Sequence, residues 1–228
     1  MTTPSLSVDA AIKTRISTRV FKPDPLPEAL VREILDVARW SPSGGNVQPW
    51  KVKVVAGEAR QGVIDAARGA LTANPAGEEG DYPIYPANLW APHRDWRFKV
   101  GEDMYALLGI PREDKFARLA WVSRNLQFFD APVGLFFVID QRMGHGQWAH
   151  LGMFMQTIAL AAHARGVGTC MQEAWGRVRA TLKAHFALPE TEIVYCGMAM
   201  GWPDETAPVN KLRTDRIEVD QFATFAGF

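Results

Sequence analysis

The sequence predicts a single domain of the α+β class, and three observations support this. The chain has 228 residues, a length that fits one domain with a substantial core. Hydrophobic residues make up 47% and charged residues 22%, as in ordinary globular domains. Segments with apolar residues at helical spacing are mixed with short apolar runs typical of strands. No internal repeat or linker divides the chain, so we expect one domain over residues 1–228.

The first quarter of the chain predicts two helices and a strand. Ser7 can cap a first helix, with Asp9 in its opening turn. Pro27 suits the first position of a second helix, whose apolar residues recur at helical spacing through Ala38. Valines near position 54 predict a strand. A further helix is expected over 59–71.

Residues 72–101 show no clean period. The stretch contains four prolines and several aromatic side chains, among them Trp90, Trp96 and Phe98. A loop this long in a compact domain is usually functional or disordered, and its aromatic content argues against disorder. We therefore expect a semi-ordered cap over a binding site, with a helix beginning near Gly101. An insertion that only packs on the surface is the alternative.

The second half of the chain predicts alternating helices and strands. The run over 132–139 is almost wholly apolar and indicates a central strand buried on both faces. The helix expected over 147–165 is apolar nearly all round, as in a core or interface helix. The other expected elements are a helix over 112–129, a strand over 166–172, a helix over 178–186 and a strand over 193–200.

The C-terminal arm, residues 208–228, is irregular and unusually apolar. It carries Phe222, Phe225 and Phe228. A free tail of this kind would expose apolar surface. It is expected either to pack on its own domain or to reach across to a partner.

Composition and charge exclude several classes of function. The net charge is zero and the isoelectric point is about 7.0, which gives no electrostatic case for binding nucleic acid or an anionic membrane. No apolar run reaches the ~18 residues of a membrane helix, and no signal peptide opens the chain. Cys170 and Cys196 lie in apolar runs and are expected to be buried thiols in a reducing cytoplasm. The five histidines show no ligand spacing, so no metal site is expected.

A basic segment precedes the first prolines. Four cationic residues and no acid lie between Ala10 and Pro23. In an extended segment alternate residues point the same way, so Arg15, Ser17 and Arg19 would converge on one side. Two guanidinium groups with a hydroxyl between them suit a phosphate dianion. The alternative is a solvated basic face.

A second polar segment follows the next helix, in the sequence Trp-Ser-Pro-Ser-Gly-Gly-Asn-Val-Gln-Pro-Trp at 40–50. Gly44 and Gly45 let the backbone turn and approach a ligand closely. Ser43, Asn46 and Gln48 offer donors and acceptors on a segment stiffened by two prolines. The alternative is a plain loop between helix and strand.

Together, the patterns R-x-S-x-R-x-F and S-P-S-G-G-N-x-Q-P-W resemble the FMN-dependent nitroreductase family, and the likeness extends over nearly the whole chain. The resemblance implies a three-layer α+β fold, in which helices flank a central, mainly antiparallel sheet and dimerisation completes the domain. It also implies a homodimer with FMN sites at the subunit interface. The implied activity is ping-pong hydride transfer from NAD(P)H through FMN to nitroaromatics, quinones or activated enones.

The resemblance also assigns residues to the FMN site. No side chain is expected to be catalytic, because the flavin N5 carries the chemistry. Met171 stands where the family often has proline, and Ala174 where it often has glycine. Asn125 is expected at the pyrimidine edge of the flavin. The cofactor-binding set is Arg15, Ser17, Arg19, Pro42, Ser43, Gly44, Asn46, Asn125, Met171, Gln172, Glu173, Lys211 and Arg213.

Substrate selection is assigned to the cap. Its aromatic and cationic side chains Trp90, Arg94, Trp96 and Arg97 are the candidates for contacting an aromatic acceptor.

Two other functions stay open at this point. Gly144, Gly146 and Ala149 fit G-x-G-x-x-A after a buried strand, the pattern of an NAD-dependent dehydrogenase with a dinucleotide-binding fold. The chain could also be a flavin-binding protein without turnover.

Overall fold

A four-stranded antiparallel sheet forms the centre of the computed structural model, which describes residues 6–80 and 82–228. The strand order is β1-β2-β4-β3, so β1 and β3 lie at the two edges. Each pairing between neighbouring strands of this sheet is antiparallel, which confirms the predicted, mainly antiparallel sheet. The strands are β1 (Lys51–Ala56), β2 (Val133–Asp140), β3 (Gly168–Gln172) and β4 (Glu192–Gly201).

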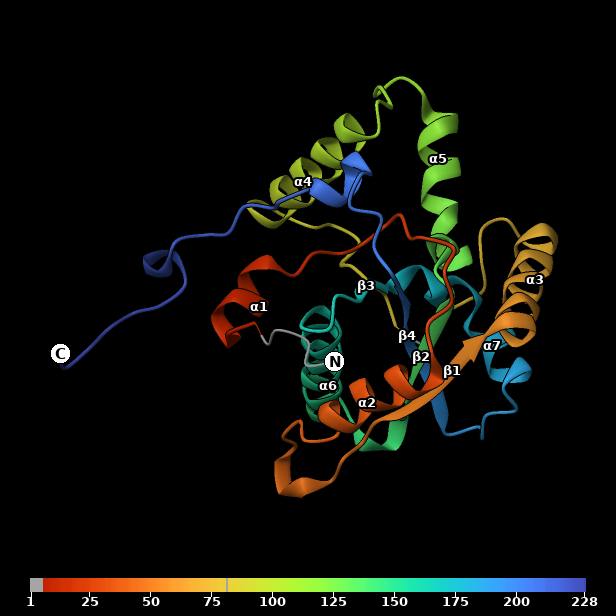
Figure 1. Cartoon of the computed structure of the whole chain (residues 1–228), viewed down its shortest axis with the longest axis horizontal. Helices are drawn as coiled ribbons and strands as arrows, with labels where there is room; N and C mark the ends of the chain where they lie inside the picture. Colours follow the sequence, from red (N-terminus) through yellow and green to blue (C-terminus); the bar gives the residue numbers. More distant parts are fainter. Residues whose placement is uncertain (1–5, 81) are drawn as a thin grey trace.

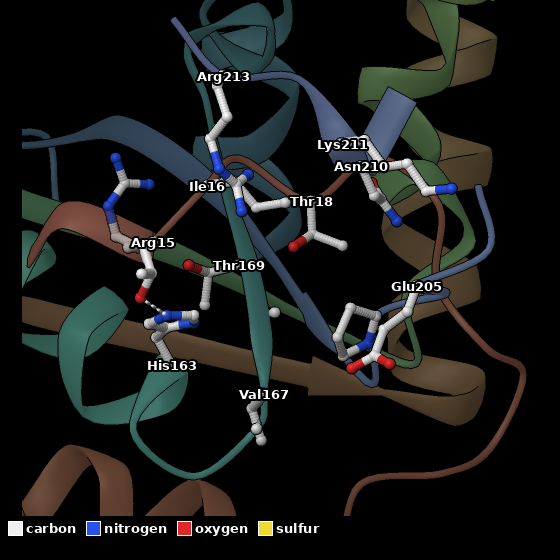
Figure 2. A pocket seen from close by; sticks show the side chains of 14 residues that line it. Arg15, Ile16, Thr18, His163, Val167, Thr169, Glu205, Asn210, Lys211 and Arg213 are labelled. Carbon is white, nitrogen blue, oxygen red and sulfur yellow. Dashed lines mark hydrogen bonds between the residues drawn. The ribbon is translucent and has the colours of Figure 1, made fainter. Parts of the chain in front are cut away.

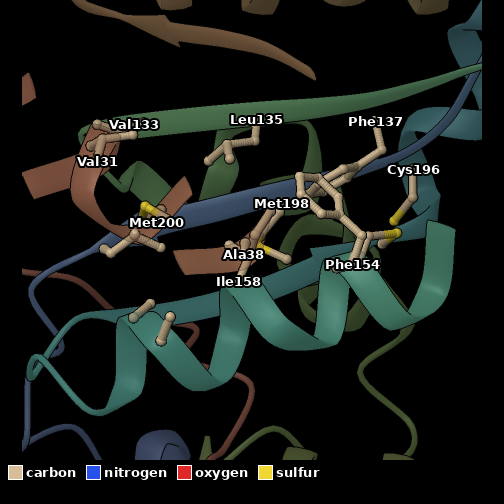
Figure 3. Packing of buried hydrophobic residues seen from close by; sticks show 14 of the residues in the cluster. Val31, Ala38, Val133, Leu135, Phe137, Phe154, Ile158, Cys196, Met198 and Met200 are labelled. Carbon is tan, nitrogen blue, oxygen red and sulfur yellow. The ribbon is translucent and has the colours of Figure 1, made fainter. Parts of the chain in front are cut away.

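Helices cover both faces of the sheet, which confirms the three layers (Figure 1). One face packs against α2 (Glu28–Ala38) and α6 (Gly146–His163). The other packs against α3 (Gly57–Ala73) and α7 (Arg179–His185). Successive residues of β2 serve the two cores in turn, as strand geometry requires. Figure 3 shows Leu135 and Phe137 with the side chains of α6, whereas Phe136 and Val138 belong to the opposite core.

The basic segment runs along the β3 edge of the sheet. It follows α1 (Val8–Thr14), which Ser7 caps as predicted by accepting a hydrogen bond from the Ala10 N–H at 3.2 Å. Ser17 then forms an isolated parallel bridge with Thr169 of β3. The segment is therefore extended, and it lies beside the outer strand.

The predicted cap contains a helix that starts earlier than expected. Helix α4 (His93–Leu107) begins eight residues before Gly101. No residue of α4 is buried, so its sequence has no apolar stripe that could mark its start. The first part of the cap, in contrast, is anchored on the domain. The Glu78 carboxylate accepts from Thr181 of α7, and Arg177 donates to the Pro75 carbonyl at 2.7 Å.

The helix predicted over 112–129 is shorter in the structure. Helix α5 (Lys115–Ser123) begins at a cap in which Asp114 accepts from the Ala117 N–H at 2.9 Å. The remainder is the 3₁₀ segment η2 (Arg124–Asp130), which ends where Phe128 and Phe129 adopt positive φ values of 55° and 52°. Both rings are fully buried, so their apolar character reflects packing in the core. In the sequence it looked like the continuation of a helix.

The dehydrogenase alternative is wrong, because the sheet excludes a dinucleotide-binding fold. That fold needs parallel neighbouring strands joined through a helix. Here β4 lies between β2 and β3, and both pairings are antiparallel. The two glycines, Gly144 and Gly146, join the 3₁₀ turn η3 (Gln141–Met143) to α6.

The C-terminal arm starts on the domain and then leaves it. The turn η5 (Pro208–Lys211) contains the buried residues Val209 and Asn210. Beyond it, past the short turn η6 (Val219–Gln221), the chain extends away from the sheet (Figure 1). Phe222 and Phe225 are 67% and 62% exposed. They do not pack on their own domain, so the first alternative for the arm is wrong for its distal part.

None of the described helices has the length and apolar character needed to cross a membrane. Cys170 and Cys196 are buried free thiols, as predicted.

Candidate functional site

The open edge of β3 is the backbone of the candidate site. The Thr18 N–H donates to the Thr169 carbonyl at 2.9 Å, so the backbone groups of Thr169 face away from β4. Backbone direction repeats every second residue along a strand, so the N–H and carbonyl of Met171 face the same way. Met171 lies about 7 Å further along the strand. The edge thus presents a backbone donor and acceptor beyond the isolated bridge between Ser17 and Thr169.

Alternate residues of the basic segment line one cavity of about 410 Å³. Arg15, Ser17 and Arg19 all face it, as the spacing predicts. Arg213, Thr214 and Arg216 face it from the C-terminal segment, and Lys13 faces it from the last turn of α1. No acidic side chain contributes to this lining among the described residues. The cavity therefore concentrates positive charge from two distant parts of the chain.

A second cavity, of about 440 Å³, shares Arg15 and Arg213 with the first (Figure 2). Of the intervening residues, Thr18 faces this cavity and Ile16 lines both cavities. Of the two predicted C-terminal cations, Lys211 lines only this second cavity, whereas Arg213 lines both cavities. Its other charged or titratable lining residues are His163 and Glu205. Arg15 and Arg213 together form the wall between the two cavities.

The electrostatics of this wall favour an anion. The Nε of Arg15 is buried and has no hydrogen-bond partner within the described residues. Burial and the neighbouring Arg216 lower the pKa of the Arg15 guanidinium. A phosphate dianion between Arg15 and Arg213 would satisfy the buried N–H and offset the repulsion between the guanidinium groups. The donor set therefore fits the phosphate of FMN.

A buried asparagine that the sequence analysis missed holds the two cationic segments together. The Asn210 Oδ1 accepts from the N–H groups of Arg19, at 2.9 Å, and Val20, at 3.3 Å. Its Nδ2 donates to the carbonyls of Val20, at 2.7 Å, and Asp204, at 2.8 Å. The available signal was its place directly before the K-x-R pattern. Asn210 thus fixes Lys211 and Arg213 relative to the basic segment.

At the end of β3 the predicted residues divide into two groups. The side chain of Gln172 is buried, donates to the Asn125 carbonyl at 2.8 Å and accepts from Trp175 at 3.3 Å. The Gln172 side chain is therefore occupied within the protein, and only its backbone is left for the predicted contact with the flavin. Met171 is 37% exposed. The Glu173 side chain is partly buried, its Oε2 has no partner among the described residues, and burial raises its pKa.

Asn125 lies in η2, next to this strand end. Its side-chain amide donates to the Val122 carbonyl at 2.9 Å, and its own carbonyl accepts the bond from Gln172. Among the described residues no hydrogen bond to the amide oxygen is found. The structure therefore places Asn125 beside Gln172, and its role at the pyrimidine edge stays a prediction.

The glycine loop lies far from the basic segment of the same chain. The Gly44 N–H donates to His150 near the start of α6 at 3.3 Å, whereas Thr14 contacts His163 at the other end of that helix. Thirteen residues of helix separate the two histidines, a distance of about 20 Å. Gly45 has a φ of +59°, in the left-handed region that favours glycine, which explains why glycine stands at this position. Pro42, Ser43, Gly44 and Asn46 do not join the cationic residues within one subunit.

Helix α4 brings the cap to the edge of the 410 Å³ cavity. Val100 lines this cavity, and Trp96 is one turn earlier on the same helical face. Lys99 pairs with Asp215 at 3.0 Å, which ties the helix to the C-terminal segment.

The four predicted substrate residues lie at the start of α4 or just before it. Trp90 and Trp96 both meet the His93 ring edge to face, with centroids 5.7 Å and 5.2 Å away. Arg97 stacks over Tyr85 at 4.2 Å, and Arg94 pairs with Asp95 at 3.0 Å. The two tryptophans are 59% and 43% exposed, so an aromatic surface is open to solvent beside the cavity.

No group of three or more histidine, cysteine or acidic side chains in the described residues could hold a metal ion.

Comparison with known proteins gives consistent matches along the chain. The model of the nitroreductase family matches residues 12–202. The chain is 37% identical to a nitrobenzene nitroreductase of Ectopseudomonas oleovorans and 36% identical to a 4-nitrobenzoate reductase of Pseudomonas putida, each over 96% of both chains. Its structure superposes on the crystal structure of the FMN- and NADPH-dependent nitroreductase NfnB from Sphigopyxis sp. strain HMH with a TM-score of 0.95. That match has 40% identity and covers 98% of this chain and 100% of the other.

Proposed function

Because the chain belongs to the nitroreductase family, we propose that it is an FMN-dependent oxidoreductase that transfers hydride from NAD(P)H to nitroaromatic acceptors. The observation that carries the proposal is the convergence of Arg15, Ser17, Arg19 and Arg213 on one cavity beside the open edge of β3. Quinones and activated enones, which share the electron-poor character of nitroaromatics, fall within the same expected acceptor range.

Charged side chains and backbone groups of this chain bind different parts of FMN. Arg15 and Arg213 hold the phosphate through charge-assisted hydrogen bonds, and Ser17 adds a hydroxyl donor. The backbone N–H of Met171, at the open edge of β3, would donate to the ring system of bound FMN. Glu173, partly buried near the end of that strand, adds a carboxyl group whose raised pKa reflects poor solvation. Bound FMN supplies the hydride-accepting and hydride-donating atom.

The place of the glycine loop supports a homodimer with two shared sites. Gly44 of this loop contacts α6 about 20 Å from the point where Thr14 contacts the same helix, so it does not reach the phosphate-binding arginines of its own chain. A second copy packed along α6 can bring its loop to the flavin ring. Exposed apolar side chains support such packing. They are Val8 and Ile12 of α1, Met153 of α6, and Phe222, Phe225 and Phe228 of the arm.

The cap gives the site its preference for aromatic acceptors. Trp90 and Trp96 offer ring faces for stacking beside the cavity, and Arg94 and Arg97 offer donors to a nitro or carboxylate group. The similar proteins named for nitrobenzene and 4-nitrobenzoate fit this chemistry. The buried thiols fit a reducing cytoplasm.

Purified protein tests the proposal. It should be yellow and should bleach anaerobically with NADH or NADPH, and its colour should return when nitrobenzene is added. Colourless protein that takes up no added FMN would contradict the proposal. Yellow protein that neither nucleotide reduces would favour a passive flavin-binding protein.

A further inference from the structure

The last residue of α6 is a histidine that faces the cationic wall. His163 lines the 440 Å³ cavity together with Arg15, Lys211 and Arg213, and Figure 2 shows its ring among the labelled residues of this lining. The side chain is partly buried. It sits in the last turn of the helix, where the carbonyl groups favour a positive charge. Neither the sequence pattern nor the proposed function uses this residue.

Hydrogen bonding fixes which ring nitrogen of neutral His163 carries the proton. The Thr14 hydroxyl lies 2.6 Å from the Ala10 carbonyl and 2.8 Å from the His163 Nε2. A hydroxyl has one proton, and the carbonyl can only accept. Both contacts are satisfied when Thr14 donates to Ala10 and the Nε2–H of His163 donates to Thr14. Nδ1 of the neutral ring is then a lone pair, and protonation places an N–H and a positive charge there.

The groups that face His163 disfavour its charge while no anion is present. Arg15 approaches it from the end of α1, Lys211 and Arg213 approach from the C-terminal segment, and Glu205 is the one acidic side chain in the described lining. Burial lowers the pKa of His163, and Arg15 and Arg213 lower it further. An anion held between these arginines would act on His163 in the opposite direction.

We propose that His163 is part of the phosphate site and becomes protonated when FMN binds, so that cofactor binding takes up a proton. The proposal rests on the proposed function, because it places the FMN phosphate between Arg15 and Arg213. That position is on the wall shared by both cavities, and His163 faces this wall. Imidazolium then adds a donor and a charge that neutral histidine lacks.

The proposal predicts a specific pH dependence. Protonated His163 binds the phosphate better, so its contribution to affinity is present at low pH and disappears as the pH rises above the pKa of the FMN-bound state. A rise of one pKa unit on binding corresponds to a tenfold gain in affinity. The second ionisation of a phosphate monoester, with a pKa of about 6, acts in the opposite direction, because the ligand loses charge at low pH. The effect must therefore be measured against a variant that cannot titrate.

His163→Gln is that variant, because its side-chain amide can still donate to Thr14. His185→Gln is the matched control, since His185 also ends a helix but belongs to α7 on the opposite side of the sheet. Dissociation constants for FMN, and for riboflavin, which lacks the phosphate, are measured by flavin fluorescence on the deflavinated proteins from pH 5.5 to 8.5. The ratio of wild-type to H163Q affinity for FMN should rise from about one at pH 8.5 to about tenfold at pH 5.5. It should stay flat for riboflavin, and H185Q should follow the wild type.

An FMN affinity ratio that does not change with pH would overturn the role of His163 while leaving FMN binding intact. Wild-type protein that binds no FMN at any pH would overturn both this inference and the proposed function. Should H163Q fail to fold, a proton NMR titration of the wild-type histidine rings decides the matter. The pKa of His163 should rise on addition of FMN, and an unchanged or lower value would contradict the proposal.

Discussion

The cationic wall and helix α4 border the same cavity, yet they are held in different ways. The wall is fixed by the backbone bond from Thr18 to Thr169 and by bonds between the buried side chain of Asn210 and the backbone of the basic segment. Helix α4 has no buried residue and is tied mainly through charged pairs, such as the bidentate bond from Arg118 of α5 to Glu102 at 2.5 Å and 3.0 Å. A cofactor that stays bound needs fixed donors, whereas a site for varied acceptors benefits from an adaptable cover.

Arg15→Ala tests the fixed side and should have the largest effect. Removing a guanidinium that makes charge-assisted bonds costs about 2–3 kcal/mol, so the affinity for FMN should fall roughly 30- to 150-fold. Titration of the deflavinated protein with FMN measures this. Arg39→Ala, which removes an exposed arginine paired with Asp36 on α2, is the matched control and should leave affinity unchanged. Equal affinities for all three proteins would contradict the assignment of the wall.

Asn210→Ala tests whether the wall depends on its buried anchor. The change leaves two N–H groups and two carbonyls without their partner, and should lower the free energy of unfolding by about 2–3 kcal/mol. Chemical denaturation measures the loss. FMN affinity should fall together with stability, because Lys211 and Arg213 lose their position. A stable variant with normal affinity would show that the segment is held in another way.

Deletion of the residues after Val219 tests the arm. The truncated protein loses three exposed phenylalanines that we assign to the partner's surface, and its dimer should dissociate about tenfold more readily or retain less flavin. Analytical ultracentrifugation and the flavin absorbance of the purified protein report the two effects. A truncated protein that stays dimeric and yellow would refute this role.

Trp96→Ala tests the adaptable side and should have the smallest effect. Loss of one stacking face should raise the KM for nitrobenzene about fivefold, the equivalent of roughly 1 kcal/mol, and leave the KM for NAD(P)H nearly unchanged. Phe116→Ala, which removes an exposed ring of α5 outside the lining of either cavity, is the matched control. Equal effects on both substrates, or none, would count against α4 as the cover.

The sequence predicts those elements and contacts of this molecule that follow from a regular spacing of residues. Strand β2 and the stripe of α2 follow from apolar spacing, and the convergence of Arg15, Ser17 and Arg19 follows from the geometry of an extended segment. Helix α4 was placed too late because it buries nothing and so leaves no pattern.

Other features depend on the tertiary structure. Gln172 lies within the motif, yet its side chain is taken up by Asn125 and Trp175, partners that only the folded chain brings together. His163 and Asn210 form hydrogen bonds with Thr14 and Arg19, which lie 149 and 191 positions away in the sequence. Local residue spacing cannot reveal contacts of this kind. The glycine loop is separated from Arg15 because the two segments contact opposite ends of α6. The sequence alone does not show that either segment contacts this helix.

A crystal structure of the protein with FMN tests the central claim most directly. The account predicts the phosphate within hydrogen-bonding distance of Arg15 and Arg213, and the ring system along the edge of β3 against the 42–46 loop of a second subunit. A flavin bound away from these arginines, or a ring contacted by the loop of its own chain, would contradict it.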